Sequence, residues 1–166
     1  MNQFSTDAIP RRVVVSGMAA FALAAALPEF AFAQSDPMLG TWKLNLAKST
    51  YSPGPPPRSA SLTYRPDGPN LRRIAEGADA EGKPTKSEWT HIYDGKPYAT
   101  PGVADYDTST YSRVDAHTVN FTRIKAGKLV QAGLIIVSGD GKTLTVVTAG
   151  TAANGKHISN TAVYDK

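Results

Sequence analysis

The chain contains no cysteine in its 166 residues. This absence excludes disulfide bonds, thiol nucleophiles, iron–sulfur clusters and thiolate-bound zinc sites. A length of 166 residues is also too short for two ordinary domains. We therefore expect one domain that owes its stability to a single hydrophobic core rather than to covalent cross-links.

The sequence also lacks the short motifs that mark common enzyme classes. No Gly-x-Ser-x-Gly nucleophile elbow, Walker loop or Gly-x-Gly-x-x-Gly dinucleotide loop is present. The three histidines, His91, His117 and His157, are never spaced as His-x-x-x-His, so the sequence indicates no metal-binding pair. We therefore expect no catalytic residue, no metal ion and no cofactor.

Charge is low and evenly spread, with 18 basic and 14 acidic residues giving a net charge of +4. The basic residues are scattered singly apart from Arg72 and Arg73, and no basic stripe with interleaved aromatics is present. This pattern predicts a solvated surface and no nucleic-acid partner. Asp105 and Asp107 lie close together, but a calcium loop needs more oxygen ligands, so we expect them to be solvated loop residues.

Residues 1–33 have the organisation of a cleavable export signal. A polar start is followed by the pair Arg11-Arg12 and by an apolar run from Val13 to Leu27, which is short for a membrane anchor. Small residues predict cleavage between Ala33 and Gln34, and the paired arginines resemble a twin-arginine leader, with an ordinary secretory leader as the alternative. We expect a periplasmic or secreted protein with no membrane anchor after cleavage.

Residues 34–166 form a succession of short segments with β-strand character. In the first segment Trp42, Leu44 and Leu46 alternate with polar residues, which is typical of a half-buried strand. Turn residues such as Asp94-Gly95 separate the segments, and no amphipathic helix is evident after the leader. The pattern predicts nine strands: Leu39–Leu46, Ser61–Arg65, Leu71–Ala78, Thr85–Tyr93, Thr108–Val114, Thr118–Lys125, Leu129–Val137, Thr143–Thr151 and His157–Tyr164.

Two segments interrupt this pattern. Tyr51–Ser59 contains four prolines, which lack a backbone donor, so we expect it to cross the surface rather than join a sheet. Pro97–Asp107 contains Pro101-Gly102 and two acidic residues, and we expect it to be irregular.

Consecutive strands joined by short turns pair antiparallel, so these strands predict an up-and-down meander. An open sheet of this size would expose two edges, whereas closure into a barrel removes both. The fold class that we predict is therefore all-β, with about 8–9 strands closing into a barrel over residues 34–166. A two-sheet sandwich is the competing architecture, but only the two irregular segments could cross between its sheets.

The start of the first strand, Gly40-Thr41-Trp42, resembles the Gly-x-Trp signature of the lipocalins and related calycin barrels. The resemblance implies a lipocalin-like barrel in which Trp42 plugs the closed end and a late basic residue packs across it. Gly40 and Trp42 would then be structural residues. Four residues are candidates for the basic partner: Arg113, Arg123, Lys156 and Lys166.

A longer pattern resembles a group of small, uncharacterised secreted bacterial proteins. The matching segments are Gly-Thr-Trp-Lys-Leu-Asn at Gly40–Asn45, Tyr-Asp-Gly-Lys at Tyr93–Lys96, Ser138–Thr145, and the terminal Val163–Lys166. This resemblance implies an exported β-domain but no known activity.

Several strand faces mix apolar residues with a cation. Leu71 shares a face with Arg73, and Phe121 shares one with Arg123. If these faces point inward, the cavity would suit a small hydrophobic or amphipathic anion, such as a fatty acid or an aromatic acid. Alternatively, the arginines lie at strand ends and reach solvent along their stems. The residues that we select as lining a cavity are Tyr64, Trp89, His91, Tyr93, Phe121 and Arg123.

Three functional hypotheses follow. The first is an exported lipocalin-like barrel that binds a small apolar or amphipathic molecule, with Arg123 supplying charge pairing. The second is a cell-envelope interaction or stress protein with a packed barrel, whose contact surfaces would be Pro53–Pro57 and Pro97–Asp107. An enzyme ranks third, because no nucleophile–base pair is evident. The sequence does not determine the oligomeric state.

Overall fold

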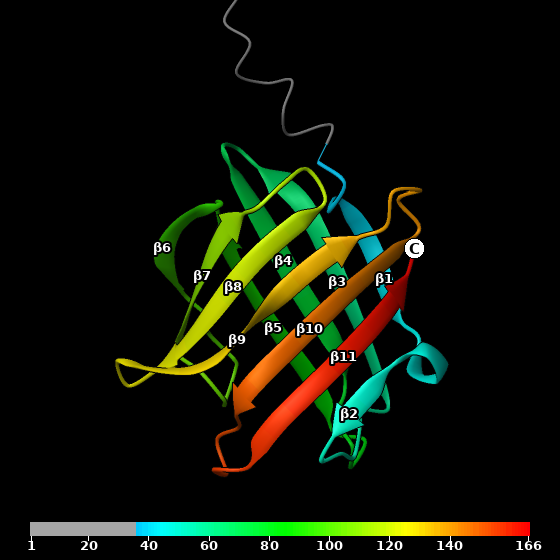
Figure 1. The fold of residues 1–166 in the computed structure, drawn as a ribbon, viewed down its shortest axis with the longest axis vertical. Coiled ribbons are helices and arrows are strands. Elements are labelled where there is room, and N and C mark those ends of the chain that lie inside the picture. The colour runs from blue at the N-terminus through cyan, green and yellow to red at the C-terminus, as the bar shows by residue number, and fades with distance from the viewer. Residues whose placement is uncertain (1–35) are drawn as a thin grey trace, which may run out of the picture.

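The structure, a computed structural model, describes residues 36–166. The expected leader, residues 1–33, and its cleavage point between Ala33 and Gln34 lie outside the described residues. Residues 36–166 form one antiparallel sheet of eleven strands that curls into a nearly closed barrel (Figure 1). The predicted all-β meander is thus confirmed, with two more strands than the sequence indicated.

The strands are short and joined mostly by tight turns. Their bounds are β1 Gly40–Leu44, β2 Thr50–Ser52, β3 Ser59–Asp67, β4 Asn70–Ala78, β5 Pro84–His91, β6 Asp94–Ala99, β7 Thr108–Arg113, β8 Thr118–Lys125, β9 Lys128–Val137, β10 Thr143–Thr151 and β11 His157–Asp165. A single 3₁₀ turn, η2 Leu46–Lys48, separates β1 from β2. Buried and more exposed residues alternate along most strands, so that one face of the sheet lines the interior of the barrel.

The order of strands around the barrel is β5-β4-β3-β1-β11-β10-β9-β8-β7-β6. In Figure 1, β8 to β11 form the front wall and β3 to β5 form the back wall. The first strand, β1, joins the two halves of the sheet by pairing with β3 on one side and with the last strand, β11, on the other. The one seam lies between β5 and β6, which stand at the two ends of the hydrogen-bonded order.

Three details correct the sequence-based expectations. The segment Pro97–Asp107 is not irregular throughout, because Pro97–Ala99 belongs to β6 and pairs with β7. The surface crossing Tyr51–Ser59 begins with two residues of β2, which pair with β11. Leu46 does not share the buried face of Trp42, because the chain turns into η2 there and leaves Leu46 42% exposed.

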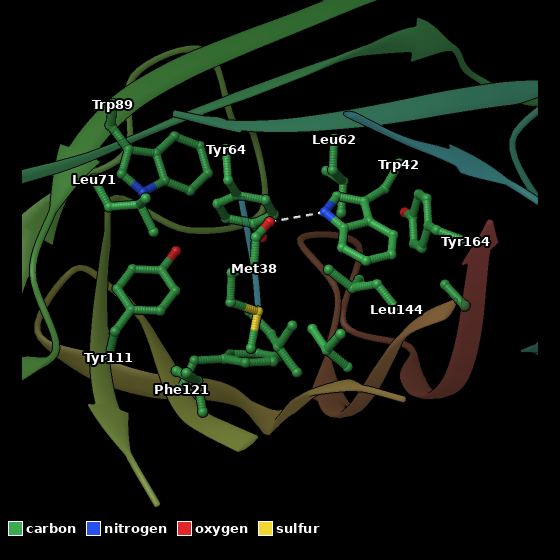
Figure 2. Close-up of a cluster of buried hydrophobic side chains, with 14 residues drawn as sticks. Met38, Trp42, Leu62, Tyr64, Leu71, Trp89, Tyr111, Phe121, Leu144 and Tyr164 are labelled. Atoms are coloured by element: carbon green, nitrogen blue, oxygen red, sulfur yellow. Dashed lines mark hydrogen bonds between the residues drawn. The ribbon is translucent and has the colours of Figure 1, made fainter. Parts of the chain in front are cut away.

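Trp42 is fully buried in the interior of the barrel. Its indole Nε1 donates a hydrogen bond of 2.8 Å to the carbonyl oxygen of Met38, drawn in Figure 2. The ammonium of Lys166 lies 4.8 Å from the centroid of the Trp42 ring, so Lys166 is the late basic residue that packs across this tryptophan. Gly40 has a φ of 123°, and a Cβ there would meet the Lys166 stem at 2.7 Å, so glycine permits this close packing.

Candidate functional site

A small cavity of about 60 Å³ lies in the interior of the barrel. Its lining comes from both walls and divides into two chemical classes. The aliphatic and aromatic part consists of Leu62, Tyr64, Tyr111, Phe121, Ile135, Val146 and Tyr164. The charged part consists of two guanidinium groups, those of Arg73 and Arg123. The candidate site is therefore a cavity lined by two guanidinium groups, three tyrosines and four apolar side chains.

Arg73 lies on the inward face of β4 because it alternates with the buried Leu71. Across the sheet it stands between Tyr64 on β3 and Trp89 on β5. Its guanidinium carbon lies 4.3 Å from the centroid of the Trp89 ring, a cation–π contact that covers one face of the group. The Nη1 nitrogen is buried and has no hydrogen-bond partner within residues 36–166.

Arg123 lies on the inward face of β8, two residues after the buried Phe121. Its guanidinium carbon is 4.5 Å from the ring centroid of Phe121 and 4.6 Å from that of Tyr106. Nη1 donates a 2.8 Å hydrogen bond to Oε1 of Gln131, whose amide nitrogen donates in turn to the carbonyl of Thr151. The Nε of Arg123 is buried without a partner in the described part of the chain.

Other buried donors in the barrel also lack partners. The Tyr64 hydroxyl, the Trp89 indole nitrogen and the Ser109 hydroxyl have none among residues 36–166. Burial raises the pKa of Tyr111 to about 12, so its hydroxyl keeps its proton and can donate at neutral pH. Buried polar groups are normally hydrogen-bonded, so a concentration of unsatisfied donors requires a physical explanation.

No acidic side chain neutralises the two arginines within residues 36–166. Neither Arg73 nor Arg123 takes part in any of the ion pairs of that region. None of its buried residues is an aspartate or a glutamate. Because arginine keeps its charge in proteins, the interior carries two positive charges without a fixed counter-charge.

His91 is buried beside the cavity rather than in its lining. Its ring stacks on Tyr111 with 4.0 Å between centroids and meets Tyr93 edge-on at 5.7 Å. Burial, and to a smaller extent the charge of Arg73, lowers the pKa of His91 to about 3. At neutral pH the imidazole is therefore an uncharged wall residue that holds a proton on only one of its nitrogens.

The six residues selected from the sequence occupy three different places. Tyr64, Phe121 and Arg123 line the cavity. Trp89 and His91 are buried next to it, and Figure 2 shows the Trp89 indole on the same side of the interior as Tyr64. Tyr93 lies elsewhere, with its ring 4.0 Å from the guanidinium of Arg113, which pairs with Asp36.

The selection missed Arg73 and the two tyrosines Tyr111 and Tyr164, which complete the polar lining. A signal for Arg73 was present, because its alternation with Leu71 places both on one strand face. The sequence could not show that this face points inward. Both arginines are partly exposed, as the alternative of stems reaching solvent requires, but Nη1 of Arg73 and Nε of Arg123 are buried.

The loop Thr100–Asp107 is anchored against the barrel. Tyr106 is buried and covers Arg123, while the two flanking acids act as anchors. Asp105 accepts a 2.9 Å hydrogen bond from the backbone nitrogen of Ala153, and Asp107 accepts from the ammonium of Lys125 and the backbone of Ala126. Asp107 is exposed, as expected, and both aspartates also anchor the loop that carries Tyr106.

Two properties of the described residues and two comparisons with known proteins complete the description. In residues 36–166, no three histidine, aspartate or glutamate side chains gather closely enough to hold a metal ion. That same part of the chain has no helix of the length and apolarity needed to cross a membrane. A scan against protein-family models matches no family, and a search of the curated proteins finds no match to this chain.

Proposed function

We propose that this chain is an exported, lipocalin-like barrel that binds a small molecule in its interior cavity. One observation carries the proposal: the cavity lies between the two walls, and Tyr64, Arg73 and Arg123 in its lining each have a buried donor with no partner in residues 36–166. Leaving such groups unsatisfied costs free energy, and a bound molecule that accepts their hydrogen bonds recovers it. Natural proteins retain such costs where function requires them.

The lipocalin-like part of the proposal is supported by the packing of Trp42. This residue of the Gly-x-Trp motif is fully buried in the interior of the barrel, and Lys166 packs on it. The export part is supported by the organisation of residues 1–33, a basic pair followed by a short apolar run. The alternative of an interaction protein gains no support from the loop Thr100–Asp107, because its large aromatic residue, Tyr106, is buried against Arg123.

Native mass spectrometry of protein purified from its own host tests both parts. We expect an intact mass that starts at Gln34, together with a non-covalent adduct that disappears on denaturation. Val146→Phe should abolish the adduct, because Val146 lines the cavity and a larger ring fills it. Val147→Phe is the matched control, since the next residue on β10 is 37% exposed, outside the cavity lining.

The outcomes separate clearly. Loss of the adduct in the Val146 variant alone supports a ligand inside the barrel. Equal adducts in both variants place the ligand on the outer surface and contradict the proposal. Host protein that carries no adduct and binds none of the anionic and neutral probes described below also contradicts it.

A further inference from the structure

We propose that the ligand is a small carboxylate, a molecule of a few heavy atoms, whose oxygens are bound by Arg73 and Arg123 together with the Tyr64 hydroxyl. This inference rests on the proposed function and specifies its ligand class. It follows from the charge of the lining, the buried donors that lack partners in residues 36–166, the size of the cavity and the aliphatic side chains on part of its wall.

The charge argument is that the interior needs a negative partner. Two guanidinium groups face one cavity, and neither is paired with an acidic side chain in residues 36–166. Both side chains are partly buried, and removing even part of an unpaired charge from water is unfavourable for an arginine, which keeps its proton. An anion in the cavity supplies the counter-charge that this part of the chain does not.

The donor argument is that each guanidinium group has one buried in-plane donor without a partner in residues 36–166, while aromatic rings lie over its face. Trp89 covers a face of Arg73, and the rings of Phe121 and Tyr106 lie over Arg123. Stacking of this kind leaves the in-plane N–H groups free, and Nη1 of Arg73 and Nε of Arg123 are the buried ones without partners. Carboxylate oxygens accept several charge-assisted hydrogen bonds in one plane, which matches these donors.

The size argument limits what the anion can be. A cavity of about 60 Å³ has room for a ligand of only a few heavy atoms. It is far smaller than the roughly 300–1,000 Å³ of sites for drug-sized ligands. A long-chain fatty acid therefore does not fit, and acetate or propionate is of the right order.

The shape of the remaining wall distinguishes a carboxylate from phosphate or sulfate. Ile135 on β9 and Val146 on β10 are direct cross-strand neighbours, and Leu62 on β3 adds a third aliphatic side chain. A carboxylate presents a charged end and an apolar end, which suits a cavity with both kinds of wall. Phosphate and sulfate present oxygens in every direction and would leave some of them against the aliphatic side chains.

Calorimetric titration of the ligand-stripped mature protein tests this inference. Acetate and propionate are the probes, acetamide is the neutral isostere of acetate, and inorganic phosphate and dodecanoate represent the competing classes. We expect acetate to bind at least tenfold more tightly than acetamide. In a ¹H–¹⁵N spectrum, acetate should shift the Arg123 Nε signal and the Trp89 indole signal, because both groups belong to the charged side of the interior.

Three arginine variants locate the binding. Arg73→Met and Arg123→Met should each weaken acetate binding at least tenfold, because each keeps the stem but removes the charge and the donors. Arg65→Met is the matched control, because Arg65 lies exposed on β3, and its affinity for acetate should be unchanged. If either inward variant fails to fold, Tyr64→Phe replaces it, since it removes only one unpartnered hydroxyl and should still weaken binding.

The results distinguish the inference from the proposal beneath it. Equal affinities for acetate and acetamide, or unchanged binding in both inward variants, overturn the carboxylate assignment while leaving a small-molecule site intact. Binding of phosphate or dodecanoate without acetate overturns it as well. Absence of any binding, together with absence of an adduct in protein from the host, refutes the proposed function itself.

Discussion

Replacing Trp42 with phenylalanine should strongly destabilise the barrel, because three contributions are lost together. The indole hydrogen bond to the Met38 carbonyl disappears and leaves a buried acceptor unpaired, which lowers the free energy of unfolding by about 1–3 kcal/mol. The contact with the Lys166 ammonium weakens, at about 0.5–1 kcal/mol. The smaller ring buries less apolar surface, at about 1 kcal/mol. We therefore expect the free energy of unfolding to fall by about 3–4 kcal/mol.

Trp89 provides an internal comparison for this experiment. It is buried as well, but its indole nitrogen has no hydrogen-bond partner within the described residues. Trp89→Phe should therefore cost less than Trp42→Phe by about 1–3 kcal/mol, the value of the bond to Met38. Lys166→Met should cost no more than about 1 kcal/mol, because it removes only the cation–π contact.

Urea unfolding at 25 °C measures all three variants, provided that the slope against urea concentration stays constant. A parallel thermal melt should show the Trp42→Phe midpoint about 10 °C below that of the unmodified protein. Equal losses in the free energy of unfolding for the two tryptophan variants would show that ring volume, and not the Met38 hydrogen bond, determines how much Trp42 stabilises the fold. That result would refute the reasoning.

Two further predictions concern a close approach and a buried histidine. Gly133→Ala should cost about 3 kcal/mol or more in urea unfolding, because its Cβ would overlap the Val147 carbonyl and the Phe121 ring, whereas Gly127→Ala, with open space and a φ of 76°, should cost about 1–2 kcal/mol. His91 has a pKa of about 3 in the folded chain, below its ordinary 6.5. The unfolded chain therefore binds this proton more readily. The contribution of His91 to the free energy of unfolding is therefore fully present above about pH 6.5. It is lost as the pH falls toward 3, at up to about 1.4 kcal/mol per pH unit. Acid unfolding should be less steep in His91→Phe, and an unchanged slope would contradict this assignment.

Much of the fold could be predicted because a half-buried strand shows a local alternation of apolar and polar residues. The bounds expected for Thr118–Lys125 and Thr143–Thr151 agree with β8 and β10. The strand β6 was missed because Pro97 breaks the local pattern. Proline is tolerated there because β6 stands at the end of the sheet order, where a missing donor leaves no partner strand unpaired. Position in the sheet is a tertiary property that the local sequence does not contain.

The cavity was predicted less completely. Its lining depends on the position of each residue along the barrel axis as well as on whether its side chain points inward. Alternation places Trp89 and His91 inside, and the structure does bury both. Strand stagger then decides which inward residues meet across the interior, and it brings Arg73 from β4 opposite Arg123 from β8. The two arginines that face one cavity come from segments far apart in the sequence. Only the register of the whole sheet brings them together.

The placement of β1 between β3 and β11 has a consequence for how the chain folds. Asn45, directly after β1, hydrogen-bonds to Asp165, 120 residues further along the chain. The two halves of the sheet can therefore join only after nearly all of the chain has reached its place. Such distant pairings carry a large loop-closure cost and slow folding into the range of milliseconds to seconds. The hairpins from β7 to β10 join strands that are neighbours in sequence, and they should form early. The pairing of β1 with β11 should form last.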